Sequence, residues 1–164
     1  MDKQRQNSVY VNMMVDTLRR KETILTILHE QTQQQERLLK EQELDLEQFQ
    51  HLLDLKGEKI QELNELDEGF DALFRMVQKD ISADKERYRE EIQTMQKLIG
   101  TVTELGVKIQ ALEHQNSERL KIYLATQRKT IRDFHVNHKM AESYYKNMAD
   151  SHKPEQSYFF NEKK

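Results

Sequence analysis

Apolar residues recur every three or four positions along most of the chain, a spacing that is typical of long amphipathic α-helices. In the first stretch, which we expect to be helical over residues 8–40, the apolar stripe becomes polar at residues 31–35. This interruption predicts either a hydrated, loosely packed layer or a buried polar layer that sets the register of the helices. The apolar positions around it are Val11, Met14, Val15, Leu18, Ile24, Leu25, Ile27, Leu28, Leu38 and Leu39.

A second helix is predicted over residues 46–79. Asp45 precedes it as an N-cap, and Gln48 stands three residues later, where a reciprocal capping partner is expected. Gly57 and Gly69 lie inside this stripe, and each costs about 1 kcal/mol relative to alanine. They indicate either close approach of a neighbouring helix or a local bend. The stripe is the most apolar of the chain and consists of Leu46, Phe49, Leu52, Leu53, Ile60, Leu63, Leu66, Phe70, Leu73, Phe74 and Val77.

A third and longer helix is predicted over residues 84–133, after cap residues at 80–84. At a rise of 1.5 Å per residue it would reach about 75 Å, against roughly 50 Å for the first two helices, so one end should project beyond them. Gly100 and Gly106 fall inside it and are expected to be tolerated. Its stripe includes Tyr88, Ile92, Met95, Leu98, Ile99, Val102, Leu105, Ile109, Leu112, Leu120, Tyr123, Leu124, Ile131 and Phe134.

The three stripes predict an all-α protein: an elongated antiparallel bundle of three long helices with coiled-coil character, over residues 1–135. The chain has one proline and four glycines among its 164 residues, with 34% charged and 36% hydrophobic residues. Such a composition disfavours folds with many tight turns. It suits a bundle in which each helix buries only one stripe.

The segment 136–164 continues the helical spacing weakly through His138, Ala141, Tyr145 and Met148. We expect this segment to be flexible, or helical only when it binds a partner. Its methionine and tyrosine residues have no evident partner within the three-helix bundle, so the stripe is predicted to be exposed and available to another protein. Alternatively, the segment folds back onto the bundle or pairs with a second copy of the chain.

No motif for catalysis, for a cofactor or for a metal is apparent, so we expect a protein that is not an enzyme. The chain has no cysteine, no glycine-rich phosphate loop and no His-Glu-x-x-His pattern. Of its six histidines, only His135 and His138 share a helical face, whereas a metal site needs three or four converging ligands. Paired acidic residues elsewhere are typical of solvated helix surfaces.

Charge and hydropathy narrow the classes of partner. Residues 128–164 carry eight Lys/Arg and five Asp/Glu, so residues 1–127 carry the net negative charge of the chain. A negative body disfavours nucleic-acid binding, which needs a basic surface. No apolar run approaches the roughly 20 residues that span a bilayer, and the N-terminus lacks the features of a secretory signal. We therefore expect a cytoplasmic protein without membrane insertion.

Three segments resemble one known family: residues 15–25 (VDTLRRKETIL), 56–67 (KGEKIQELNELD) and above all 65–74 (ELDEGFDALF). Together with the order of the predicted helices, they are similar to the FlgN-type flagellar export chaperones of bacteria, over about residues 10–135. The resemblance implies a cytoplasmic chaperone of the flagellar type III export system. Such a protein binds the C-terminal helices of hook–filament junction proteins, prevents their premature assembly and delivers them to the export gate.

We expect the client to bind at the end of the third helix and on the segment after it. Two other functions remain open: a scaffold coiled coil that self-associates as a homodimer, and a type III chaperone for a different client, such as a filament-cap or virulence protein. The residues predicted to contact the client are Tyr123, Leu124, Ile131, Phe134, Met140, Tyr144, Tyr145 and Met148.

Overall fold

The computed structural model describes the backbone of residues 2–127 and 132–151, and the side chains of residues 2–126 and 139–148. This part of the chain is all-α, as predicted, with four α-helices and no strand. The elements are α1 (Asp2–Leu39), α2 (Leu46–Ala83), a 3₁₀ turn η1 (Glu86–Tyr88), α3 (Arg89–Gln127) and α4 (Arg132–Ser151).

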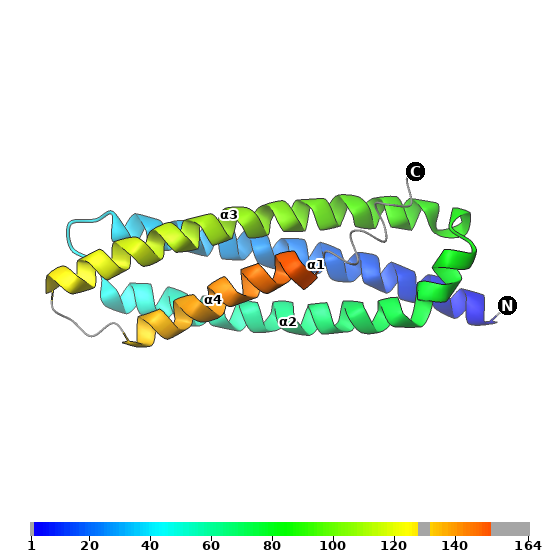
Figure 1. Ribbon diagram of the computed structural model, residues 1–164, viewed down its shortest axis with the longest axis horizontal. Helices are drawn as coiled ribbons and strands as arrows, with labels where there is room; N and C mark the ends of the chain where they lie inside the picture. Colours follow the sequence, from blue (N-terminus) through cyan, green and yellow to red (C-terminus); the bar gives the residue numbers. More distant parts are fainter. Residues whose placement is uncertain (1, 128–131, 152–164) are drawn as a thin grey trace.

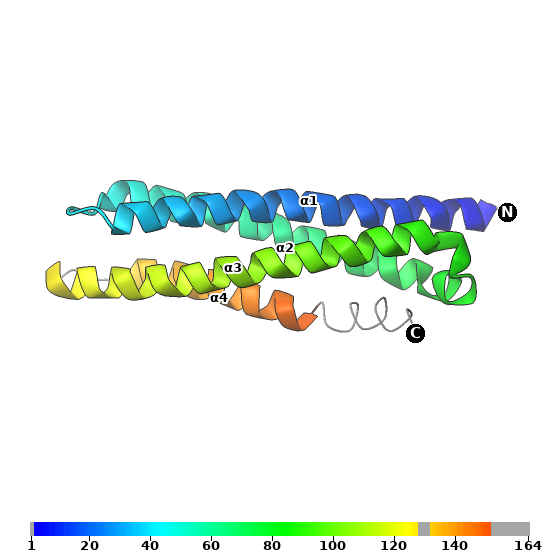
Figure 2. The same ribbon diagram turned by 90° about the horizontal axis from the view of Figure 1, so that it is seen from above.

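The first three helices lie lengthwise beside one another and form a rod, and successive helices run in opposite directions (Figures 1 and 2). α1 packs against both α2 and α3. α4 also packs against α2 and α3, on the side of the rod that faces away from α1 (Figures 1 and 2). The α2–α3 pair is therefore covered by α1 on one side and, over part of its length, by α4 on the other.

Local interactions explain where the helices begin and end. Asp45 caps α2, because its carboxylate accepts a hydrogen bond from the backbone N–H of Gln48 at 3.0 Å, as the capping pattern predicts. α2 continues to Ala83, beyond the predicted end at residue 79, since Ile81 is buried in the core and Asp80 accepts a hydrogen bond from the amide of Asn7. The same bond explains why α1 begins before residue 8.

The core is divided into three apolar clusters along the rod. The first cluster joins the N-terminal part of α1 to the C-terminal part of α2 and the start of α3, and includes Leu18, Phe70, Val77, Tyr88 and Met95. The central cluster joins all four helices and includes Leu25, Leu63, Ile109, Tyr145 and Met148. The third lies near the α1–α2 turn and includes Leu38, Phe49, Leu53, Leu120 and Leu124.

The structure corrects the predicted third helix. A single helix over 84–133 was wrong: α3 begins at Arg89, after the 3₁₀ turn, and ends at Gln127. α3 has 39 residues and α1 and α2 have 38 each, so the predicted difference in length is absent among these helices. A second helix, α4, starts at Arg132 and runs back along the bundle (Figure 1). The physical reason is that this reversal lets the apolar face of α4 be buried.

Candidate protein-binding groove

The groove between α2 and α3 holds the apolar face of α4. Four of the described side chains of α4 are buried in it, at helical spacings of three, four and seven residues: Ala141, Tyr144, Tyr145 and Met148. Residues of this spacing share one face of a helix. They join the central cluster, where the neighbours from the long helices include Ile24, Leu28, Ile60, Leu63, Val102 and Ile109.

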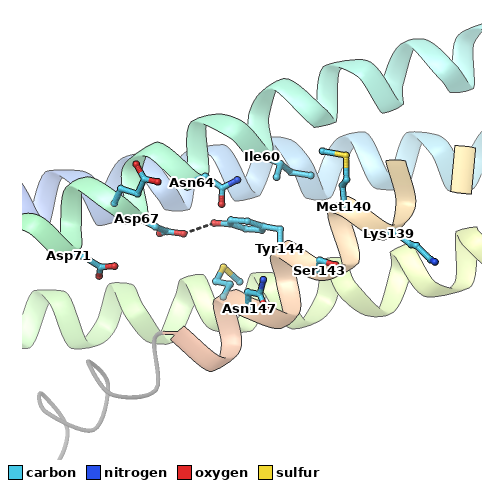
Figure 3. Close-up of a pocket in the computed structure, with 11 residues that line it drawn as sticks. Ile60, Asn64, Asp67, Asp71, Lys139, Met140, Ser143, Tyr144 and Asn147 are labelled. Atoms are coloured by element: carbon cyan, nitrogen blue, oxygen red, sulfur yellow. Dashed lines mark hydrogen bonds between the residues drawn. The ribbon is translucent and has the colours of Figure 1, made fainter. Parts of the chain in front are cut away.

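A polar network ties α4 to α1 and α2. Asp67 of α2 accepts a hydrogen bond from the Tyr144 hydroxyl on one carboxylate oxygen, at 3.0 Å. Its other oxygen lies 2.5 Å from the ammonium of Lys21 on α1. The side chain of Lys21 is 1% exposed and that of Asp67 is 23% exposed, so the carboxylate lies at the border between core and solvent. Figure 3 shows the Tyr144 hydroxyl pointing at Asp67.

The two adjacent tyrosines of α4 differ in their hydroxyl groups. Burial raises the pKa of Tyr144, and the negative charge of Asp67 raises this pKa further. Burial also raises the pKa of Tyr145, whose hydroxyl is buried and has no hydrogen-bond partner among the described residues. The two rings pack edge to face, with centroids 5.7 Å apart. Tyr144 is therefore both an apolar and a polar contact, whereas Tyr145 contributes through packing.

Gly106 lets α4 approach α3 closely. A Cβ atom at this position would overlap the terminal methyl of Met148 on α4. At Gly57, Gly69 and Gly100 a Cβ atom would meet no atom of the described residues within 4 Å. For glycine within a helix the sequence left two alternatives, close approach of a neighbouring helix or a local bend. Close approach applies at Gly106 of α3, a position where the sequence predicted only that glycine would be tolerated.

Open grooves run along both flanks of α4. The groove between α2 and α4 has a volume of about 730 Å³, and Figure 3 shows the side chains that line it. Its α2 wall is acidic, with Asp67, Glu68 and Asp71, and Met140 of α4 borders it with 59% of its surface exposed. A second groove of about 750 Å³, between α3 and α4, is lined by Val107, Gln110, Ala111, His114, Gln115, Lys139, Glu142, Ser143 and Lys146.

A second buried polar network joins α1, α2 and α3 between the central and third clusters. The ammonium of Lys56 on α2 forms an ion pair with Glu113 on α3, and both side chains are almost fully buried. Lys56 also donates to the Gln35 amide oxygen at 2.7 Å, and Asn116 donates to the backbone oxygen of Thr32 at 3.1 Å. Burial lowers the pKa of Lys56, because the charged ammonium loses its hydration.

This network decides the question raised by the polar residues 31–35. Thr32 and Gln35 are buried and hydrogen-bonded to side chains of the other two helices. A loosely packed, hydrated layer is therefore wrong for these two positions. The alternative, a polar layer that fixes the register of the helices, agrees with the observed contacts.

The structure separates the eight predicted client-contacting residues. Tyr144, Tyr145 and Met148 lie together but face the interior, so the prediction that their stripe is exposed is wrong. Among the α4 residues of the set whose side chains are described, only Met140 is exposed. Leu124 is buried in the third cluster with Tyr123 packed against it. Ile131 and the side chain of Phe134 lie outside the described residues, as do the side chains of His135 and His138.

Sequence reasoning missed Lys21, Asp67 and Gly106 as parts of this groove. A signal existed for Lys21, which stands in the apolar stripe between Leu18 and Leu25 at the helical spacing. A charged residue at a stripe position predicts a buried partner. The identity of that partner, Asp67, depends on how α1 and α2 are aligned, which the stripe alone does not give.

Among residues 2–127 and 132–151, no cluster of three or more His, Asp or Glu residues with described side chains is placed to bind a metal ion. Over the same residues, none of the helices combines the length and the apolar character that crossing a bilayer requires. Comparisons with protein-family models, with curated proteins and with solved structures give no match to this chain.

Proposed function

We propose that this protein is a cytoplasmic export chaperone of the bacterial flagellar type III system, of the FlgN type. Its clients would be the amphipathic C-terminal helices of hook–filament junction proteins, which it keeps from assembling and hands to the export gate. The three long helices, α1 to α3, form the antiparallel body that receives the client. The resemblance of residues 15–25, 56–67 and 65–74 to that family supports this assignment.

One structural observation carries the proposal: the groove between α2 and α3 holds an amphipathic helix, α4, by side-chain packing. A groove that accepts one amphipathic helix has the shape and the apolar lining to accept another. α4 has 20 residues against 38 or 39 in each long helix, so less buried surface holds it in place. We propose that the client helix replaces α4.

This proposal changes the role of the predicted client-binding residues. Tyr144, Tyr145 and Met148 would not contact the client in the state described here, since they occupy the groove. They would mark the place that the client takes. After release of α4, the same residues would be exposed and free to make a second contact with the client or with the export gate.

Two full-length variants test the proposal. Tyr145→Asp places a charge in the groove and should release α4, because an unpaired buried carboxylate is strongly unfavourable. Met140→Asp, on the exposed side of the same helix, is the control. We expect the Tyr145→Asp variant to retain more junction protein than wild type in co-purification, and the Met140→Asp variant to match wild type.

Absence of binding by both variants and by wild type would contradict the chaperone function. Equal binding by all three would instead move the client away from this groove. Light scattering over a range of concentrations addresses the scaffold alternative: the proposal expects no stable oligomer without a client, whereas a self-associating scaffold would form one.

A further inference from the structure

In the groove between α2 and α3, the occupant α4 donates a hydrogen bond to a polar group of α2. That group is the Asp67 carboxylate, which receives the Tyr144 hydroxyl at 3.0 Å. Lys21, 1% exposed, holds the other oxygen of the same carboxylate. Because Lys21 fixes this carboxylate, an occupant that lacks a donor would cover the oxygen that Tyr144 contacts and would not replace its hydrogen bond. The groove therefore distinguishes an occupant that brings a donor from one that does not.

The remaining contacts define the shape of the occupant. A small residue, Ala141, is buried three positions before Tyr144, and a large aromatic residue, Tyr145, follows it directly. Four positions after Tyr144, Met148 lies over Gly106 of α3, where a Cβ atom would collide with it. The flexible, unbranched methionine side chain suits this close approach. Each contact corresponds to one position of an amphipathic helix.

We propose that this groove selects its partner helix by a hydrogen-bond donor aimed at Asp67. Resting on the proposed function, this assigns the client class: an amphipathic helix with a tyrosine preceded by a small residue at −3 and followed by an aromatic residue at +1 and a flexible apolar residue at +4. Asp67, oriented by Lys21, is the specificity-determining residue, and α4 is the chain's own copy of the recognised pattern.

The inference is tested on the complete chain with a protease site inserted between residues 127 and 132. After cleavage, α4 remains in its groove without the covalent link. Fluorescently labelled peptide 132–151 is then exchanged into the groove and displaced by unlabelled peptides, with fluorescence anisotropy as the readout. The peptides are the native sequence, Tyr144→Phe and Tyr145→Phe.

We expect the Tyr144→Phe peptide to compete about 10-fold to 100-fold more weakly than the native peptide, because the hydrogen bond lost is one to a charged group. The Tyr145→Phe peptide should compete as well as the native one, since its hydroxyl has no partner in the groove. In an Asp67→Leu chain the difference between native and Tyr144→Phe peptides should disappear.

Equal competition by native and Tyr144→Phe peptides against the wild-type chain would overturn the inference, and would show that the groove selects by apolar shape alone. A persistent difference in the Asp67→Leu chain would also overturn it. The C-terminal helices of junction proteins form a separate arm. If they fail to displace the labelled peptide while the tyrosine series behaves as expected, the proposed function fails and the selectivity of the groove stands.

Discussion

Two buried lysines, Lys21 and Lys56, each form an ion pair with an acidic residue of another helix, but the two pairs differ in their exposure to solvent. Lys56 pairs with Glu113 inside a network formed by α1, α2 and α3, and both charged side chains are sealed from solvent. Lys21 pairs with Asp67, which is 23% exposed and also binds Tyr144 of α4. The Lys56 network joins α1, α2 and α3 to one another. The Lys21 network joins α1 to α2 and also holds α4, the helix that we propose to be exchangeable.

The difference shows how solvent access decides whether a polar network can be opened. Breaking a sealed ion pair leaves a charge that water cannot reach, which is strongly unfavourable. At the rim of the groove, water can reach Asp67 once α4 has left and can replace the Tyr144 hydroxyl there at a lower cost. The network that is sealed from solvent therefore joins the three long helices, and the partly exposed network lies beside α4.

The largest effect should come from removing one partner of the sealed pair. Lys56→Met should lower the free energy of unfolding by about 3–5 kcal/mol, because Glu113 would lose its ion-pair partner and remain buried. The matched Lys21→Met should cost less, since Asp67 is open to water. Chemical denaturation followed by circular dichroism measures both.

The double variant Lys56→Met/Glu113→Leu is the control for this prediction. It removes both charges, and replacing a whole buried pair by apolar residues is often neutral or stabilising by about 1–4 kcal/mol. Equal losses of unfolding free energy in Lys56→Met and Lys21→Met would show that solvent access does not distinguish the two networks.

A rise in pH should release α4 through its tyrosines. Burial raises the pKa of Tyr144 and of Tyr145, so the docked helix keeps both protons while the undocked helix loses them above pH ~10. Docking is therefore unaffected below this pH and weakens above it, by about 1.4 kcal/mol per tyrosine for each pH unit. Ultraviolet absorbance of tyrosinate, combined with proteolysis of α4, follows the transition.

The control for the pH experiment is the double variant Tyr144→Phe/Tyr145→Phe, in which α4 has no ionisable tyrosine at these positions. Its α4 should stay docked to a higher pH than that of wild type. Release of α4 at the same pH in both proteins would assign the effect to other groups.

A smaller effect separates the adjacent tyrosines at neutral pH. Tyr144→Phe should weaken α4 docking by roughly 1.5 kcal/mol, since a hydrogen bond to a charged group is lost. Tyr145→Phe should leave docking unchanged or strengthen it, because it removes an unpartnered buried hydroxyl. Hydrogen exchange of the amides of residues 139–148 measures the opening of this helix. Equal exchange in the two variants would show that Asp67 contributes nothing to holding α4.

The smallest effect distinguishes two glycines of α3. Gly100→Ala should stabilise the protein by about 0.5–1 kcal/mol, because alanine favours the helix and the site is open. Gly106→Ala should gain less or lose stability, since Met148 must move away from the new methyl group. Thermal unfolding compares the two variants. An equal gain in stability in both would show that the Met148 side chain moves away from residue 106 at no measurable cost.

Local sequence signals were sufficient for the helix class and for the position of the turn between α1 and α2. Asp45 caps α2 as predicted, by accepting a hydrogen bond from the backbone N–H of Gln48, and the predicted bounds 46–79 lie within α2. These features depend on residues close together in the chain. For the same reason the polar positions 31–35 were recognised as an interruption, although the sequence alone left its nature open.

The reversal before α4 could not be obtained from the stripe. The spacing of Ala141, Tyr144, Tyr145 and Met148 is the same whether this face meets solvent, a client or the protein's own groove. Which surface covers it depends on whether α2 and α3 leave room beside α1, a tertiary property. The pairing of Lys21 with Asp67 escaped prediction in the same way, because it depends on the alignment of two helices far apart in sequence.

The division of the core into three clusters has a consequence for how the molecule opens. Neither end cluster contains a described residue of α4, whereas the central cluster contains four. Departure of α4 should therefore loosen the packing in the middle of the rod, while the clusters at both ends of the rod stay folded. A client helix could then enter the groove from the side of the rod, between the two end clusters, without unfolding of the long helices.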